Sequence, residues 1–126
     1  MQSLRHAVNM TPPTTRESTG ARERLLTAAV EAFAEKGFSA TTTRDIASRA
    51  GMSPAAVYVH HDSKESLLFR VSLDGHEHAL QILTEAAAAA DSPVDRVRQM
   101  VHAFSRWHAE HSRVGRIVQY EYHALT

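Results

Sequence analysis

The 126-residue chain contains no cysteine, only five glycines and four prolines, and no long apolar run. The lack of cysteine excludes disulfide bonds and thiolate metal sites and is compatible with the cytoplasm, where we expect the protein to reside. No segment approaches the roughly 18 apolar residues of a membrane helix, and the start Met1-Gln2-Ser3 is too polar for a signal peptide, so we expect no membrane partner. Because β-branched and polar residues do not alternate, we expect an all-α fold.

The chain also has no excess of charge of either sign, with 14 Lys+Arg against 14 Asp+Glu. It therefore lacks the general basic field that is typical of many nucleic-acid-binding proteins. Any contact with DNA must depend on cations placed locally and on the N-termini of helices.

Apolar periodicity and capping residues predict six helices after a flexible N-terminal arm of residues 1–20. A three-helix unit is expected over residues 21–66, with its first helix over 21–36 and ended by Gly37. Residues 67–126 are expected to begin a second domain: a long helix from Ser63 to about Ala90, a fifth from Pro93 to near His111, and a sixth from about Val114. Because no glycine or proline ends the sixth helix, we expect a piece of a longer protein; the alternative is a natural C-terminus that packs against a partner subunit.

The segment from Thr41 to Lys64 is the most informative part of the chain. Thr42 with Asp45 three residues later predicts a capped helix, and Gly51 is suited to the left-handed turn that ends it. Ser53 followed by Pro54 then predicts the start of another short helix. Two short helices joined by a tight turn indicate a helix-turn-helix, which places its second helix in the major groove of DNA.

The same region resembles the TetR (tetracycline-repressor-like) family over about Arg22 to Leu68. The resemblance lies in Arg24-Leu25-Leu26, Ala28-Ala29, Ala32-Phe33, Glu35-Lys36-Gly37-Phe38, Thr41-Thr42-Thr43-Arg44-Asp45-Ile46-Ala47, Ala50-Gly51-Met52-Ser53, Val57-Tyr58, His60 and Ser63-Lys64-Glu65-Ser66-Leu67. It implies a homodimeric, non-enzymatic transcriptional regulator, generally a repressor, that binds double-stranded operator DNA and a small effector. Two residues depart from the family pattern: His61 where phenylalanine is usual, and Ala55 where glycine is common.

The candidate DNA-binding residues lie at the start of the second helix and along the third. Arg44 is expected to contact a phosphate or a base edge, and Ala and Val side chains to meet thymine methyl groups. The family resemblance implies phosphate contacts for Tyr58 and Lys64. Thr42 and Ser53 have the alternative role of helix caps. The full candidate set is Thr42, Thr43, Arg44, Ser53, Pro54, Ala55, Ala56, Tyr58, Val59, His60 and Lys64.

Large apolar side chains in the last two helices suggest the lining of an effector cavity. The candidates are Met100, Phe104, Trp107, Ile117 and Tyr120. The segment from Arg116 to Glu121 is similar to regulators of lipid or sterol metabolism that sense acyl-coenzyme A esters, which suggests an apolar, lipid-like effector.

The sequence also bears on three other interpretations. The nine histidines suggest a metal site, but without cysteine or an ordered carboxylate pattern we expect neither metal nor cofactor. No nucleophile elbow, glycine-rich phosphate loop or paired-carboxylate motif is present, so we expect no catalytic residues and no enzyme. The alternative function is a helical protein-interaction module that does not bind DNA in a regulated way.

Overall fold

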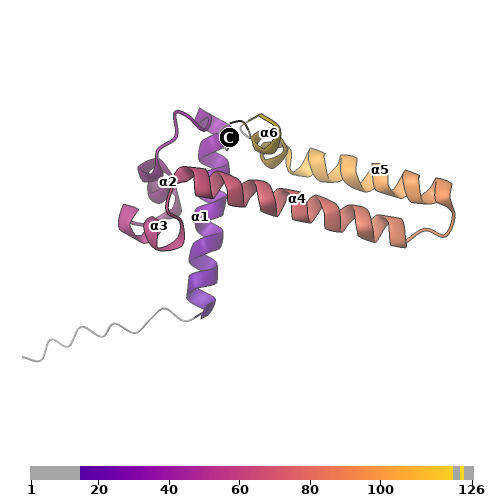
Figure 1. The fold of residues 1–126 in the computed structure, drawn as a ribbon, viewed down its shortest axis with the longest axis horizontal. Helices are drawn as coiled ribbons and strands as arrows, with labels where there is room; N and C mark the ends of the chain where they lie inside the picture. Colours follow the sequence, from indigo (N-terminus) through magenta and orange to yellow (C-terminus); the bar gives the residue numbers. More distant parts are fainter. Residues whose placement is uncertain (1–14, 121–122, 124–126) are drawn as a thin grey trace, which may run out of the picture.

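The computed structural model describes residues 15–120 and residue 123, and this part of the chain is all-α, as expected. Its helices are α1 (Thr15–Lys36), α2 (Thr43–Ala50), α3 (Pro54–His60), α4 (Lys64–Ala88), α5 (Pro93–Glu110) and α6 (Ser112–Tyr120). Helices α1, α2 and α3 gather at one end, and α4 and α5 extend from it as a long antiparallel hairpin (Figure 1). Helix α6 returns from this hairpin to pack against α1.

The predicted boundary of the N-terminal arm was wrong for residues 15–20, which form the beginning of α1. Residues 1–14 of the predicted arm lie outside the described residues. The other predicted helix starts are confirmed to within two residues. Ser63 and Ser92 cap α4 and α5, as the sequence indicates. None of the helices in the described part is long and apolar enough to cross a membrane.

One apolar core joins the three-helix end to the hairpin and to α6. Its fully buried side chains come from every helix except α5: Leu25, Ala29, Phe33, Ile46, Val57, Leu67, Leu68 and Ile117. Each buried Leu, Ile or Phe side chain contributes about 1.5–3 kcal/mol relative to the exposed state. Val57 is the buried residue of α3, and its insertion into this core fixes the orientation of the helix.

A close approach between α4 and α6 depends on Gly75. A Cβ atom at this position would lie 3.1 Å from Cγ1 of Val114, closer than real Cβ contacts normally are. The buried glycine thus lets α6 lie directly on α4, and this contact places α6 beside α1.

The outer face of α5 remains uncovered in the described chain. Val94, Val97, Val101 and Phe104 recur every three or four residues along α5, and all four are exposed. These side chains therefore remain largely accessible in the described chain, although Phe104 also lines a cavity with residues of α4 and α6.

Candidate nucleic-acid interface

Helix α2 begins with the predicted capping box. Thr42 Oγ1 accepts a hydrogen bond from the Asp45 backbone N–H (3.1 Å), and the Asp45 carboxylate accepts one from the Thr42 backbone N–H (3.0 Å). Hydrogen bonds from the Thr42 backbone and side chain, with the nearby Lys36 ammonium, hold the pKa of Asp45 below its ordinary value. This carboxylate remains charged and orders the first turn of α2, the turn that carries Thr43 and Arg44.

Gly51 makes the predicted sharp turn after α2. Its backbone is left-handed (φ 67°, ψ 35°), and the N–H of Met52 donates to the carbonyl of Ala47 at 2.9 Å. Ser53 then caps α3 by accepting from the Ala56 backbone N–H at 3.2 Å, and Pro54 is the first residue of the helix. The predicted helix-turn-helix is thus confirmed, and its caps are formed by the residues that the sequence indicates.

The candidate residues of α3 lie on its outward side. Val57 is fully buried, whereas Tyr58 is 55% exposed and Val59 is 79% exposed. Ser53, Pro54 and Ala55 are exposed, and Ala56 and His60 are half-buried. An exposed apolar side chain such as Val59, held on a short rigid helix, is suited to contact with base edges in a groove.

The start of α2 lies in the same unit and supplies the cation. Arg44 is exposed and forms no ion pair with the other described residues, and Thr43 is half-buried. The guanidinium of Arg44 is therefore available to a phosphate or a base edge. The positive end of the α2 dipole adds to its attraction for anions.

Lys64 faces the protein in this structure, although we expected it to face DNA. Its ammonium donates to the backbone carbonyls of Phe38 (2.9 Å), Ser39 (3.3 Å) and Thr41 (3.1 Å) and lies 4.4 Å from the centroid of the Phe38 ring. An ammonium has three protons, and these three acceptors use all of them. Lys64 therefore fastens the loop between α1 and α2 to the start of α4.

His61 occupies the junction between α3 and α4 and is only 8% exposed. Its Nδ1 lies 3.0 Å from Ser66 Oγ, and its buried Nε2 has no partner among the described residues. Burial lowers the pKa of His61, and the positive charges of Arg22, His60 and Arg70 lower it further, while Asp62 opposes them. The neutral imidazole is thus the form that fits this position.

We expect the stability of the chain to fall as the pH drops below about 6.5, the ordinary pKa of histidine. The folded state binds the His61 proton less tightly than the unfolded state does, so acid favours unfolding. His61→Phe removes this titration and the unpaired Nε2, and it should raise the melting temperature most at acid pH. Thermal unfolding between about pH 5.5 and 7.5 measures the effect. His102→Asn, a change of an exposed histidine, is the control. If the melting temperatures of the native chain and of His61→Phe depend equally on pH, this interpretation is wrong.

The predicted effector residues separate into two groups. Phe104 and Trp107 line a cavity of about 190 Å³ formed with Gly75, His76, Ala79, His108, Gly115, Val118 and Gln119. Ile117 instead packs in the core, and Met100 lies outside this cavity, so an effector contact by these two residues stays a prediction. The side chain of Tyr120 lies outside the described residues.

Trp107 contacts the rings of two histidines, and the sequence did not predict these contacts. It stacks on His111 (centroids 5.2 Å apart) and meets the edge of His78 (6.0 Å), and its buried Nε1 has no hydrogen-bond partner among the described residues. No group of three His, Asp or Glu side chains in that part of the chain is placed to hold a metal ion.

The sequence also did not predict a cluster of charged residues that lies between α1, α2 and α6. Arg49 of α2 pairs with Glu31 and Glu35 of α1, and Arg113 and Arg116 of α6 line the same cleft. Arg113 and Arg116 lie 64 to 85 positions after the other three residues, and no local pattern in the sequence brings the two groups together. Only the tertiary packing reveals this cluster.

The capped helix-turn-helix with an outward α3 defines a DNA-binding unit of the class that reads the major groove. Residues 25–71 match the family described as bacterial regulatory proteins, tetR family. This part of the chain is therefore the DNA-binding unit of a TetR-family transcription regulator.

Individual relatives agree with this assignment. The chain is 48% identical over 62 residues to the HTH-type transcriptional repressor KstR2 of Rhodococcus jostii. This match covers 47% of this chain and 30% of the relative. It is 38% identical over 64 residues to the HTH-type transcriptional regulator UidR of Escherichia coli K12, covering 51% of this chain and 33% of the relative. A solved tetR-family regulatory protein from Rhodococcus RHA1 superposes with a TM-score of 0.79 at 44% identity, over 84% of this chain and 56% of that one. The chain thus spans about half, or less, of the length of these proteins.

Proposed function

We propose that this chain carries the operator-binding unit of a homodimeric transcriptional repressor that a small effector releases from DNA. The observation that carries the proposal is the exposed α3, anchored by Val57 and flanked by the free Arg44 at the start of α2. Arg44 and Thr43 bind phosphates or a base edge, and Pro54, Ala55, Ala56, Val59 and His60 form the surface in the groove. Tyr58 contacts the phosphate backbone beside it.

Three of the candidate residues act mainly through the fold. Thr42 and Ser53 use their hydroxyl groups as helix caps, and Lys64 uses its protons on backbone carbonyls. Their effect on DNA binding is to position α2 and α3. The shortage of direct base readers on α3 is consistent with specificity that comes partly from DNA shape and bridging water.

The effector site in this proposal is the cavity beneath Phe104 and Trp107. Its volume of about 190 Å³ is smaller than the ~300–1,000 Å³ of pockets that enclose a whole drug-sized ligand, so it holds one apolar end of the effector. The Nε1 of Trp107 is buried and has no hydrogen-bond partner among the described residues. The proposal of an acyl compound rests on the resemblance of the segment from Arg116 to Glu121. Release follows if binding changes the spacing of two α3 helices from the roughly 34–36 Å between adjacent major grooves.

A salt titration of duplex binding tests the proposal. The duplex is one recovered from a random-sequence library by the native chain, and the affinity should fall steeply with salt. Arg44→Ala should weaken binding about tenfold and reduce the slope of log K against log salt by about 0.9, because one phosphate or base contact is lost. Arg98→Ala is the matched control, since Arg98 is an exposed arginine on α5.

If Arg44→Ala and Arg98→Ala both bind as the native chain does, the DNA-binding proposal fails. The exposed apolar face of α5 (Val94, Val97, Val101 and Phe104) would then favour the second candidate, a helical interaction module.

A further inference from the structure

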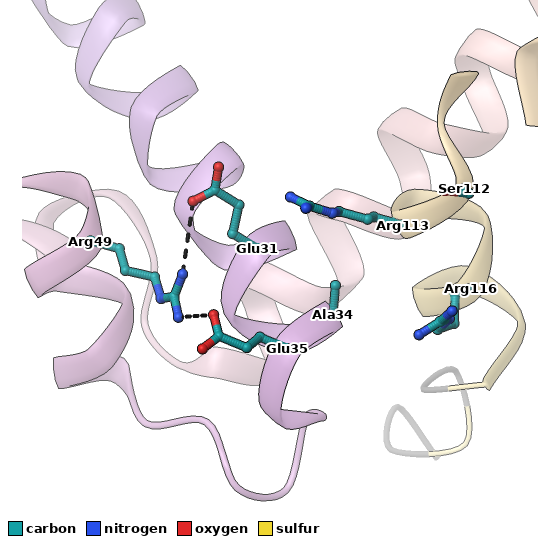
Figure 2. A pocket seen from close by; sticks show the side chains of 7 residues that line it. All are labelled: Glu31, Ala34, Glu35, Arg49, Ser112, Arg113 and Arg116. Carbon is teal, nitrogen blue, oxygen red and sulfur yellow. Dashed lines mark hydrogen bonds and ion pairs between the residues drawn. The ribbon is translucent and has the colours of Figure 1, made fainter. Parts of the chain in front are cut away.

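A polar cleft lies where α6 meets the three-helix unit, on the side of α1 that faces α6 (Figure 2). Its volume is about 600 Å³, and its walls are Glu31 and Glu35 of α1, Arg49 of α2, and Ser112, Arg113 and Arg116 of α6. Among the described residues, Ala34 is the only apolar one that lines it. A lining of this kind suits a charged, hydrated occupant and excludes an apolar one.

The charges of the cleft are unevenly paired. Arg49 Nη1 lies 3.9 Å from a Glu31 carboxylate oxygen, and Nη2 forms an ion pair with Glu35, so the two carboxylates share one cationic partner. Arg113 and Arg116 are exposed and form no ion pair with any described residue. Figure 2 shows the Arg113 side chain extending from α6 toward α1, with Arg116 on the same helix. Three guanidinium groups against two carboxylates leave the cleft with a formal charge of +1.

The start of α6 adds to this positive potential. Ser112 is the first residue of the helix, and the earliest intrahelical bond of the turn is donated by the N–H of Gly115 to the carbonyl of His111 (3.1 Å). The N–H groups before Gly115 therefore lie at the positive end of the helix, beside the two arginines. Two guanidinium groups, each able to donate two parallel hydrogen bonds, match the oxygen atoms of phosphate.

We propose that this cleft binds a small phosphate-bearing anion, held by Arg113 and Arg116 at the start of α6. The site is separate from the apolar cavity of Phe104 and Trp107 and takes a ligand of opposite character. The anion is bound by α6, because Glu31 and Glu35 on the α1 wall offer it no hydrogen-bond donor. An effect of the bound anion on the affinity for DNA would rest on the proposed function; the binding of the anion does not.

Calorimetric titration of the native chain with pyrophosphate, without DNA, tests the site. Binding should be detected, and the double variant Arg113→Ala/Arg116→Ala should weaken it at least about tenfold, because two charge-assisted hydrogen-bonding groups are lost. Arg98→Ala, a change of an exposed arginine on α5, should leave it unchanged. Circular dichroism of each variant shows that the fold is retained. Absence of binding to the native chain at millimolar pyrophosphate, or equal loss in Arg98→Ala, would overturn the proposal.

The same variants distinguish a free anion from a DNA phosphate. If the ligand is a free anion, the double variant binds duplex as the native chain does when pyrophosphate is absent. If the double variant instead binds duplex more weakly and with a smaller salt slope, the arginines contact DNA and the assignment to a free anion is wrong. Because the pyrophosphate titration contains no DNA, its failure is distinct from a failure of the DNA-binding proposal.

Discussion

Replacing Val59 by glutamate should weaken duplex binding by about 100-fold, or ~3 kcal/mol, without unfolding the chain. Val59 is 79% exposed on α3 and contributes little to the core, so the folded state should accept the change. In the groove, the new carboxylate would face phosphates and base-edge acceptors without a cation beside it. Fluorescence anisotropy of a labelled duplex measures the loss, and thermal unfolding verifies the fold.

Val97→Glu is the matched control for this experiment. Val97 is 61% exposed on α5, so the same charge is introduced on a similarly exposed valine outside the helix-turn-helix. The Val97→Glu variant should bind duplex with the affinity of the native chain, apart from a small general effect of net charge. Equal losses in the two variants would mean that the glutamate acts through total charge and that α3 has no special role.

Lys64→Met should lower the free energy of unfolding by about 2–3 kcal/mol, since it leaves the carbonyls of Phe38, Ser39 and Thr41 without their shared donor. Methionine keeps most of the apolar stem that lies against Phe38, so the loss reports the ammonium. Urea denaturation measures it.

The salt dependence of duplex binding separates this role from a direct phosphate contact. Below its unfolding midpoint, Lys64→Met should retain the slope of the native chain, whereas Arg44→Ala should show the smaller slope of a protein that has lost one contact. A reduced slope with unchanged stability in Lys64→Met would show that Lys64 binds phosphate after all.

Helix ends were predictable from the sequence wherever a cap is local. Thr42 with Asp45, Gly51, and Ser53 with Pro54 each act within three or four residues, so their spacing alone encodes the geometry that the structure shows. The outward face of α3 followed from the same pattern, because Val57 is the one large apolar side chain of the helix that faces the core.

Features that depend on distant residues were not predictable in this way. The direction of the Lys64 ammonium depends on a loop 23 to 26 positions earlier, and Ile117 joins the core because α6 folds back onto α1. The early start of α1 had no local signal, since the Thr/Ser-rich residues before Gly20 have weak helix propensity. The cluster of Arg49, Arg113 and Arg116 likewise requires the packing of three helices.

The insertion of α3 into a groove can be measured directly because the chain has no cysteine. A Val59→Cys variant that carries a tethered DNA-cleaving reagent should cut the selected duplex at sites facing the major groove, in two clusters about 10 base pairs apart if the protein binds as a dimer. The same reagent on Val97→Cys should give only background cleavage. Cleavage from Val97 that matches or exceeds cleavage from Val59 would contradict the placement of α3 on DNA.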